Sequence, residues 1–363
     1  MLKKFFLNSR AMTFRIPGKI IEVPLSVQAL ERLCTEDPRH NTTILVPPGI
    51  FTLRRPLTPS SNTRLVGFGL LTIIRLARNA NCHIVSTKGR TGITNLSFRH
   101  LSFVGNAKHQ RKPDGLSGLT WSCCLYMWKV RRARFKGIFF FNIAQTGIQL
   151  FESNWVDIRN CFGFRFGWSG IGTTRANNIY VRNVCFQRTG NAETHSGIHF
   201  DGGSGIWVER AKLAGSSGNG LMLDSQSGPL RTAFLSVKAI RCFRGVSLSG
   251  ARENDLHHVQ LKVNATRCDV GVLVSHSSDV TVDATSVRTD QPIVIQGETT
   301  KNISILNLKF EQNQGHGMAQ APNLDSTQVN TFLGWKKRHR YFVNRLVHLF
   351  TAKETRVPPA PLG

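Results

Sequence analysis

Two aspartates and a histidine form the strongest candidate for a chemical site. Asp201 and Asp224 each end a short apolar segment typical of a strand, and His199 lies two residues before Asp201. Side chains alternate across a strand, so with Ile198 and Phe200 inward, His199 and Asp201 point outward. If the two segments pair, the two carboxylates are neighbours, and such closeness raises the pKa of one of them. An acid beside a carboxylate is the pair that glycosidic cleavage needs.

A second set of outward residues is predicted on the neighbouring strand. Trp207, Glu209 and Lys212 alternate with apolar residues, and Trp155 and Tyr180 add aromatic rings to nearby segments. Aromatic faces stack on sugars in carbohydrate grooves. We therefore take Trp207, Glu209, Lys212 and Tyr180 as candidate substrate-binding residues.

Two observations limit this chemistry. An aspartate before Gly or Ser commonly bonds its own backbone in a turn, and this structural interpretation applies to Asp201 and to Asp224 taken singly. His257 and His258 are adjacent, and neighbouring side chains on a strand point to opposite faces. We therefore expect no two-histidine metal site there.

A repeat must position these side chains. Six glycine-led segments recur at intervals of 23, 27, 23, 25 and 26 residues, which is the signature of stacked structural units. They begin at Gly147, Gly170, Gly197, Gly220, Gly245 and Gly271. A second alternating motif runs in the same phase, at residues 156–158, 179–181, 206–208, 280–282 and 303–305. Two strands per repeat, without the helical half of a leucine-rich repeat, predict an all-β parallel β-helix of about ten coils.

The segment before the repeat predicts how the solenoid begins. Residues 26–37 place Val27, Leu30, Leu33 and Cys34 on one helical face, with Ser26 as the N-cap of a helix that covers the open end. Strand-like residues 43–53 with a Pro-Gly turn follow, then Pro56-Leu57, then 64–69 ending in Gly-x-Gly, then 72–74. This order resembles the start of the pectate-lyase superfamily of right-handed parallel β-helix proteins, over residues 25–312.

The resemblance implies the fold and leaves the reaction open, because the superfamily includes pectate lyases, polygalacturonase-like hydrolases, alginate epimerases and phage tailspikes. Asp201 and Asp224 are similar to the stacked aspartates of the hydrolases, although the chain lacks their Asn-Thr-Asp, Asp-Asp and Arg-Ile-Lys motifs. The lyases imply Ca²⁺ at Asp201 and Asp224, with Arg175 taking the substrate proton. The epimerases imply proton exchange by a strand rich in Asp and His, which His195, His199 and Asp201 match in composition.

The leading hypothesis is a carbohydrate-active enzyme, a polysaccharide lyase or glycoside hydrolase or an epimerase, that acts on an anionic polysaccharide in a groove on the β-helix. The alternative is a non-catalytic β-helix that binds an anionic surface, such as a tailspike-like phage or virion component or an adhesin. A tailspike-like solenoid would form a homotrimer.

The charge balance supports an anionic partner. The chain has 47 Lys and Arg against 21 Asp and Glu, a formal net charge of +26. Such a surface attracts acidic polymers through long-range electrostatics. Nucleic acid ranks third as a partner, on charge alone, because no nucleic-acid-binding motif is present.

The eight cysteines occur mostly within apolar runs and are expected to be small buried hydrophobes, which favours a reducing compartment. The first apolar run is too short for a secretory signal, and no uninterrupted apolar stretch would span a membrane. A cytoplasmic or virion-associated location is expected.

The sequence suggests four parts. Residues 1–24 are an arm, 25–312 the β-helix with its capping helix, 313–330 a linker rich in Gly, Asn, Gln, Ser and Pro, and 331–363 a basic tail. The polar stretch 108–121 is expected to leave the solenoid as a loop. In the tail, residues 335–350 predict an amphipathic helix that covers the last coil or contacts an anionic membrane.

Overall fold

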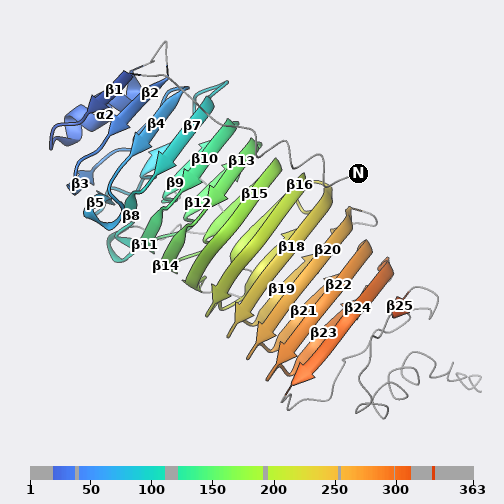
Figure 1. Ribbon diagram of the computed structural model, residues 1–363. Helices are drawn as coiled ribbons and strands as arrows, with labels where there is room; N and C mark the ends of the chain where they lie inside the picture. Colours follow the sequence, from blue (N-terminus) through green and yellow to red (C-terminus); the bar gives the residue numbers. More distant parts are fainter. Residues whose placement is uncertain are drawn as a thin grey trace, which may run out of the picture. The chain divides into compact units, whose positions relative to one another are not determined.

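The computed structural model describes residues 19–36, 41–110, 122–190, 195–251, 255–297, 299–311 and 329–331. It divides the chain into two compact units, Met1–Gly167 (unit 1) and Trp168–Gly363 (unit 2), which are described separately. Each unit is a parallel β-solenoid, and the two contain about 11 turns in total (Figure 1). The predicted all-β parallel β-helix is therefore confirmed.

Unit 1 contains the predicted helix, α2 (Val27–Thr35). The helix begins at Val27 because the Ser26 hydroxyl accepts a hydrogen bond from the Ala29 amide at 3.3 Å. Leu30 and Cys34 are buried on its inner face, as the spacing predicts. Two short 3₁₀ turns, at Gly69–Leu71 and Ala107–His109, lie farther along the unit.

Three parallel sheets make up the faces of unit 1 in the described residues. The first comprises β1 (Lys19–Glu22), β2 (Thr42–Leu45), β4 (Thr63–Val66), β7 (Thr94–Arg99), β10 (Arg131–Lys136) and β13 (Asn154–Arg159). The second comprises β3 (Gly49–Leu53), β5 (Thr72–Leu76), β8 (Ser102–Val104), β11 (Phe139–Ile143) and β14 (Phe162–Phe166). The third comprises β6 (Val85–Ser86), β9 (Leu125–Trp128) and β12 (Ile148–Phe151).

Aromatic stacks fill the interior of unit 1. Phe98 packs on Phe135 with ring centroids 5.6 Å apart, and Phe103 packs on Phe140 at 6.1 Å. Phe135 and Phe140 have no exposed surface. Equivalent positions on adjacent coils therefore carry the same bulky side chain, which buries a large apolar area in each layer.

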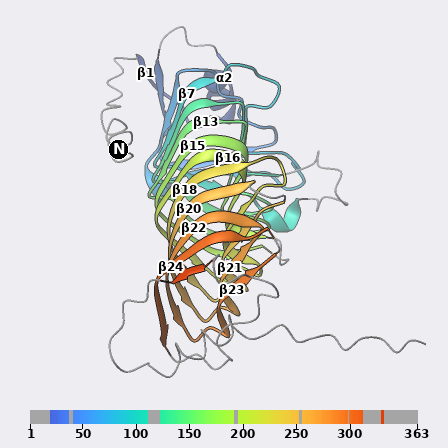
Figure 2. The same cartoon turned by 90° about the vertical axis from the view of Figure 1, so that its right-hand side faces the viewer.

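Unit 2 is built on two parallel sheets whose strands follow one another coil by coil (Figures 1 and 2). One comprises β15 (Ile171–Thr189), β16 (Ser196–Ala214), β18 (Leu230–Ile240), β20 (Leu256–Thr266), β22 (Ser277–Val287) and β24 (Lys301–Glu311), followed by β25 (Val329–Thr331). The other pairs the first part of β16 with β17 (Asn219–Asp224), β19 (Arg244–Ser249), β21 (Val270–Ser275) and β23 (Gln291–Gln296).

The repeated glycines of unit 2 have a steric cause. A Cβ atom on Gly197 would lie 2.7 Å from the carbonyl oxygen of Gly220, and one on Gly220 would lie 2.5 Å from that of Gly245. The same contact recurs from Gly170 to Gly197 and from Gly245 to Gly271. Any larger residue would collide with the backbone of the next coil, so the repeat found in the sequence marks a line of close backbone approach.

The structure refines the predicted strands. The motif at 170–173 lies, from Ile171 on, in the same continuous strand as the motif at 179–181, which is β15, and those at 197–200 and 206–208 belong to β16. The motif search missed β18 and β20, although in β20 the buried Val259, Leu261 and Val263 alternate with polar residues as in the other strands. All eight cysteines are free, and six of them are buried, whereas Cys82 and Cys185 are partly exposed.

The predicted basic tail with its helix at 335–350, and most of the linker, lie outside the described residues, as does most of the predicted loop at 108–121. In the part of the chain that is described, no helix has both the length and the apolar character needed to cross a membrane.

Candidate functional site

The register of unit 2 places the two candidate carboxylates side by side. Asp201 on β16 pairs with Asp224 on β17, as the sequence predicts. The same column continues to Thr174 on one side and to Ser249 on the other. The apolar residues that precede them, including Phe200, are fully buried, so packing fixes the backbone that carries the carboxylates.

Direct contacts join Asp201, Asp224 and His199 into one cluster. His199 Nε2 lies 2.9 Å from Asp224 Oδ2, and the carboxyl groups of Asp201 and Asp224 are close enough to share a hydrogen bond. The Asp224 side chain is 4% exposed and that of His199 29%. The imidazole is therefore the more accessible of the two.

A turn of the backbone holds the carboxylates in place. The Ser227 amide donates to Asp201 Oδ1 at 2.7 Å, and the Ser227 hydroxyl donates to Asp201 Oδ2. The Gln226 amide donates to Asp224 Oδ1 at 3.4 Å. Sequence reasoning missed Ser227, because a Ser-Gly turn carries no local signal that its hydroxyl reaches an aspartate 26 residues earlier in the chain.

The surroundings shift the pKa values of the two carboxyl groups in opposite directions. Burial, reinforced by the hydrogen bond to Asp224, raises the pKa of Asp201 to about 6 against the opposing bonds from Ser227. Burial would also raise the pKa of Asp224, but the hydrogen bond and charge of His199 outweigh it and lower that pKa below its ordinary value. The cluster thus contains one acid that retains its proton in mildly acidic solution and one carboxylate that stays ionised.

Of the two other predicted catalytic residues, His195 is close enough to His199 to be affected by its charge, and Arg175 lies one residue beyond the column of Thr174 and Asp201. Burial, followed by the charge of His199, lowers the pKa of His195 to about 4, so its ring is neutral at neutral pH. That ring packs edge-on against Trp168, with centroids 5.3 Å apart. Arg175 follows Thr174 on β15, in an exposed left-handed position with φ 49°. The role predicted for Arg175 stays a prediction.

The predicted substrate-binding residues form a separate group on the other sheet of unit 2. Tyr180 pairs in register with Trp207, and the Tyr180 hydroxyl donates to Glu209 Oε2 at 3.0 Å. Arg182 Nε lies 3.4 Å from the same oxygen. Lys212 is exposed farther along the strand and pairs with Lys238. Glu209 therefore forms a hydrogen bond with Tyr180 and an ion pair with Arg182, while Trp207 packs on Phe234 with ring centroids 4.9 Å apart.

The donor set at Asp201 and Asp224 does not fit Ca²⁺, which takes six to eight oxygen ligands. Each of the four carboxylate oxygens already has a hydrogen-bond partner, namely the Ser227 amide, the Ser227 hydroxyl, the Gln226 amide or His199. Ca²⁺ at this pair stays a prediction, and the reaction proposed for Asp201, Asp224 and His199 uses no metal.

The expectation that His257 and His258 diverge is wrong. Their rings lie 4.6 Å apart, because His258 has a left-handed backbone (φ 56°) that interrupts the strand alternation. Together with Asp279 they offer three ligand atoms within 4.8 Å of one another, the one group in the described residues with the spacing for a metal ion. His258 also lies 3.8 Å from Asp279 in a long ion pair.

Comparisons with known proteins agree with this architecture. The family model of the right-handed β-helix region matches residues 123–287. No curated protein matches the chain. Among solved structures, the N-terminal fragment of bacteriophage phi29 gene product 12 has 15% identity and a TM-score of 0.67, over 92% of this chain and 67% of that one.

Two enzymes show the same architecture. The polygalacturonase from Erwinia carotovora ssp. carotovora has 11% identity and a TM-score of 0.63, over 87% of this chain and 97% of that one. The A-module of a mannuronan C-5 epimerase from Azotobacter vinelandii has 12% identity and a TM-score of 0.52, over 88% and 97%. At these identities the likeness concerns the fold. The chain therefore shares the parallel β-helix fold with carbohydrate-active enzymes and with a phage protein.

Proposed function

We propose that this protein is a polysaccharide lyase that breaks a uronate polymer by proton transfer at the cluster of Asp201, Asp224 and His199. The observation that carries the proposal is the hydrogen-bonded chain from Asp201 through Asp224 to His199, in which a carboxyl group with a pKa of about 6 lies beside an ionised one. Groups whose pKa values are driven apart in this way suit acid and base roles.

His199 is the proposed base. An ionised carboxylate only accepts hydrogen bonds, so His199 Nε2 carries the proton toward Asp224 and Nδ1 is the nitrogen that takes a proton from substrate. Asp224 holds the ring in this orientation and stabilises the imidazolium that forms. The proton taken is the one on the ring carbon that bears the substrate carboxylate, because that carboxylate makes it acidic.

Asp201 is the proposed acid. As the ring proton leaves, its bonding electrons form a carbon–carbon double bond, the bond to the glycosidic oxygen breaks, and Asp201 protonates that oxygen. The geometry favours this elimination over hydrolysis, in which the two carboxyl groups stand about 5 Å or more apart on either side of the bond. It also favours elimination over epimerisation, which needs proton donors on both faces of the sugar.

The experiment is incubation with polygalacturonate, alginate and hyaluronan, following ultraviolet absorbance for unsaturated ends and, separately, reducing ends. We expect unsaturated product with one polymer, and a loss of about 10²–10⁴-fold for Asp201→Asn and for His199→Gln. Asp269→Asn, which changes an exposed aspartate of unit 2, is the matched control and should retain wild-type rate. Equal activity in Asp201→Asn, or no product from folded protein on any of the three polymers, would refute the proposal.

The second candidate function is non-catalytic binding. It is favoured by the hydrogen bonds from Ser227 and Gln226, which are those of aspartates that serve only to stabilise a turn. In that case Asp201→Asn and Asp224→Asn alter stability and leave binding of the polymer unchanged.

A further inference from the structure

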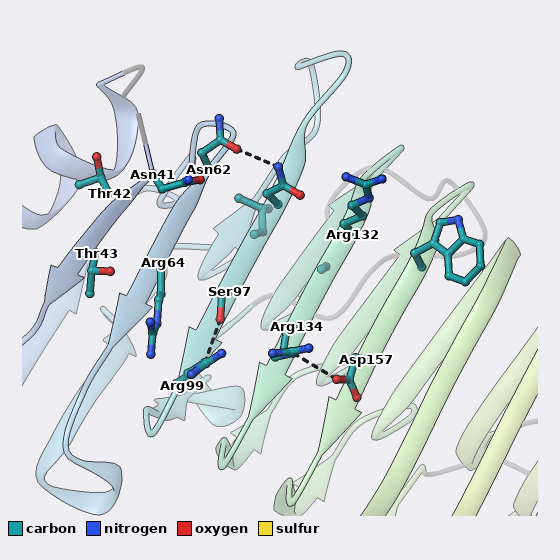
Figure 3. Close-up of a pocket in the computed structure, with 14 residues that line it drawn as sticks. Asn41, Thr42, Thr43, Asn62, Arg64, Ser97, Arg99, Arg132, Arg134 and Asp157 are labelled. Carbon is teal, nitrogen blue, oxygen red and sulfur yellow. Dashed lines mark hydrogen bonds and ion pairs between the residues drawn. The ribbon is translucent and has the colours of Figure 1, made fainter. Parts of the chain in front are cut away.

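Unit 1 contains a pocket that the sequence did not indicate. It has a volume of about 60 Å³ and is lined on the first sheet by residues of successive coils (Figure 3). Four of its lining residues are arginines, and the others include three asparagines, one tryptophan and one aspartate: Arg64, Arg99, Arg132, Arg134, Asn41, Asn62, Asn95, Trp155 and Asp157. We call this feature the arginine pocket.

The register explains why the arginines converge. Arg64 pairs with Ser97, Ser97 with Arg134, and Arg134 with Asp157, so these side chains project from the same outward column. Figure 3 shows Arg64, Arg99 and Arg134 on one face of the sheet. Adjacent strands are about 4.8 Å apart, so the guanidinium groups of neighbouring coils lie close enough to interact electrostatically.

Positive charge in the arginine pocket exceeds the negative charge available to it. Asp157 is the one acid in its lining, and it already bonds Arg134 at 3.2 Å and Arg159 at 2.5 Å. Arg99 donates to the neutral Ser97 hydroxyl at 3.2 Å. Burial lowers the pKa of Arg99, and the positive charges of Arg64 and Arg134 lower it further. The guanidinium groups therefore lie close enough to repel one another.

Two polar atoms in the arginine pocket are buried and have no hydrogen-bond partner, Arg64 Nε and Asn95 Oδ1. The Asn95 amide nitrogen donates to Asn62 at 2.9 Å, which orients that pair. Buried polar groups are ordinarily satisfied, so an unpartnered guanidinium nitrogen beside a pocket indicates a bound acceptor. Planar guanidinium groups bind carboxylate and sulfate oxygens through paired hydrogen bonds.

The size and rim of the arginine pocket restrict what it holds. A volume of about 60 Å³ accommodates a few water-sized groups, which suits one carboxylate or sulfate rather than a whole sugar ring. Trp155 is 41% exposed at the same pocket. Trp155 lies on β13, three strands and therefore about 14 Å from Arg64 on β4, so its indole suits the ring of a different sugar residue from the one whose oxyanion Arg64 binds. Single-stranded nucleic acid, in contrast, requires a series of stacking rings.

We propose that the arginine pocket is a binding site for an anionic polysaccharide, in which the carboxylate or sulfate of one sugar residue is held by Arg64, Arg99 and Arg134 while the ring of another residue of the same polymer lies on Trp155. The proposal shares its substrate class with the proposed lyase function but does not require Asp201 to be catalytic. It assigns unit 1 a carbohydrate-binding role of its own.

The test is calorimetry on full-length Asp201→Asn protein, so that turnover cannot consume the ligand. The probes are a galacturonate oligosaccharide, the same oligosaccharide with its carboxylates methyl-esterified, and a sulfated oligosaccharide. We expect the esterified probe to bind at least tenfold more weakly than the charged one. The preference between the carboxylate and sulfate probes identifies the natural oxyanion.

Three further variants are made in the same background. Arg64→Ala with Arg99→Ala should weaken binding at least tenfold, and Arg132→Gln, which changes an exposed residue at the rim, about threefold. Arg267→Ala, which removes an exposed arginine of unit 2, should leave the affinity within twofold. Arg132→Gln keeps the test decisive if the double variant does not fold.

Unchanged binding in Arg132→Gln, or in the double variant if it folds, would overturn the proposal, as would equal binding of the esterified probe. A single-stranded DNA oligonucleotide is the fourth probe, and tighter binding of this DNA that is lost in Arg132→Gln would assign the pocket to nucleic acid instead. Binding without any product in the lyase assay would refute the catalytic proposal alone, whereas product formation with no effect of the pocket variants would refute this one alone.

Discussion

The two units use the same solenoid for opposite chemistry. Unit 1 gathers four arginines around one aspartate, whereas unit 2 gathers two aspartates around one histidine. Stacked phenylalanines fill the interior of unit 1, and in unit 2 a line of glycines on successive coils lies one against the next. A parallel β-helix therefore sets only the spacing of its outward columns, and the residue placed in each column decides the chemistry.

The largest expected effect concerns the aromatic stack of unit 1. Phe135→Ala removes a fully buried ring that packs on Phe98, and it should lower the free energy of unfolding by about 3–5 kcal/mol. Urea denaturation measures the loss, and hydrogen exchange of peptides from each unit locates it. Phe162→Ala is the control, because Phe162 is 41% exposed, and a cost equal to that of Phe135→Ala would show that stacking position does not matter.

A smaller effect is expected from the glycine line of unit 2. Gly220→Ala brings a Cβ to 2.5 Å from the Gly245 carbonyl oxygen and 3.0 Å from the Ala239 side chain, so the free energy of unfolding should fall by roughly 2–3 kcal/mol. Gly89→Ala in unit 1 meets nothing within 4 Å and carries only the strain of φ +81°, about 1 kcal/mol. Thermal unfolding of the two variants compares them, and similar values would contradict the steric origin of the repeat.

The smallest effect is a pH dependence that belongs to unit 2. The pKa of Asp201 rises from an ordinary 3.8 to about 6 in the folded state, so the folded protein binds the proton more tightly than the unfolded chain. Its contribution to stability is complete below about pH 4 and is lost as the pH rises through 6. The loss should be on the order of 1 kcal/mol, less than full linkage predicts, because the group is partly solvated.

Asp201→Asn tests this dependence. The variant should lose less stability than the wild type between pH 4 and pH 6 in urea titrations at fixed salt. Asp269→Asn provides the control at an exposed position of the same unit. If the wild type and Asp201→Asn show parallel profiles across this range, the carboxyl group of Asp201 is not held in its protonated form by the fold.

The fold was predictable from the sequence because its signal is repetitive. Each coil must leave room for the next backbone, so Gly197, Gly220 and Gly245 recur in phase, and the alternation around Phe200 and Leu223 shows which side chains turn inward. The pairing of Asp201 with Asp224 follows from that phase alone. The helix at Val27–Thr35 was predictable for a local reason, since Ser26 supplies its N-cap.

The arginine pocket and the histidine pair could not be predicted in this way. Asn62 and Asn95 are 33 residues apart but Arg134 and Asp157 are 23 apart, so no fixed period aligns the columns of unit 1. His258 takes a left-handed backbone that reverses the expected direction of its side chain. Loops of unequal length and single backbone reversals are invisible to a search for periodicity.

The sequence by itself therefore determined the solenoid, its capping helix and the neighbouring positions of Asp201 and Asp224, because these depend on period and alternation. Only the tertiary structure decided that His199 bonds Asp224, that Ser227 reaches back to Asp201, and that four arginines of unit 1 share one pocket. Those contacts depend on rotamers, turn geometry and coil lengths, which become defined only when one coil lies against the next.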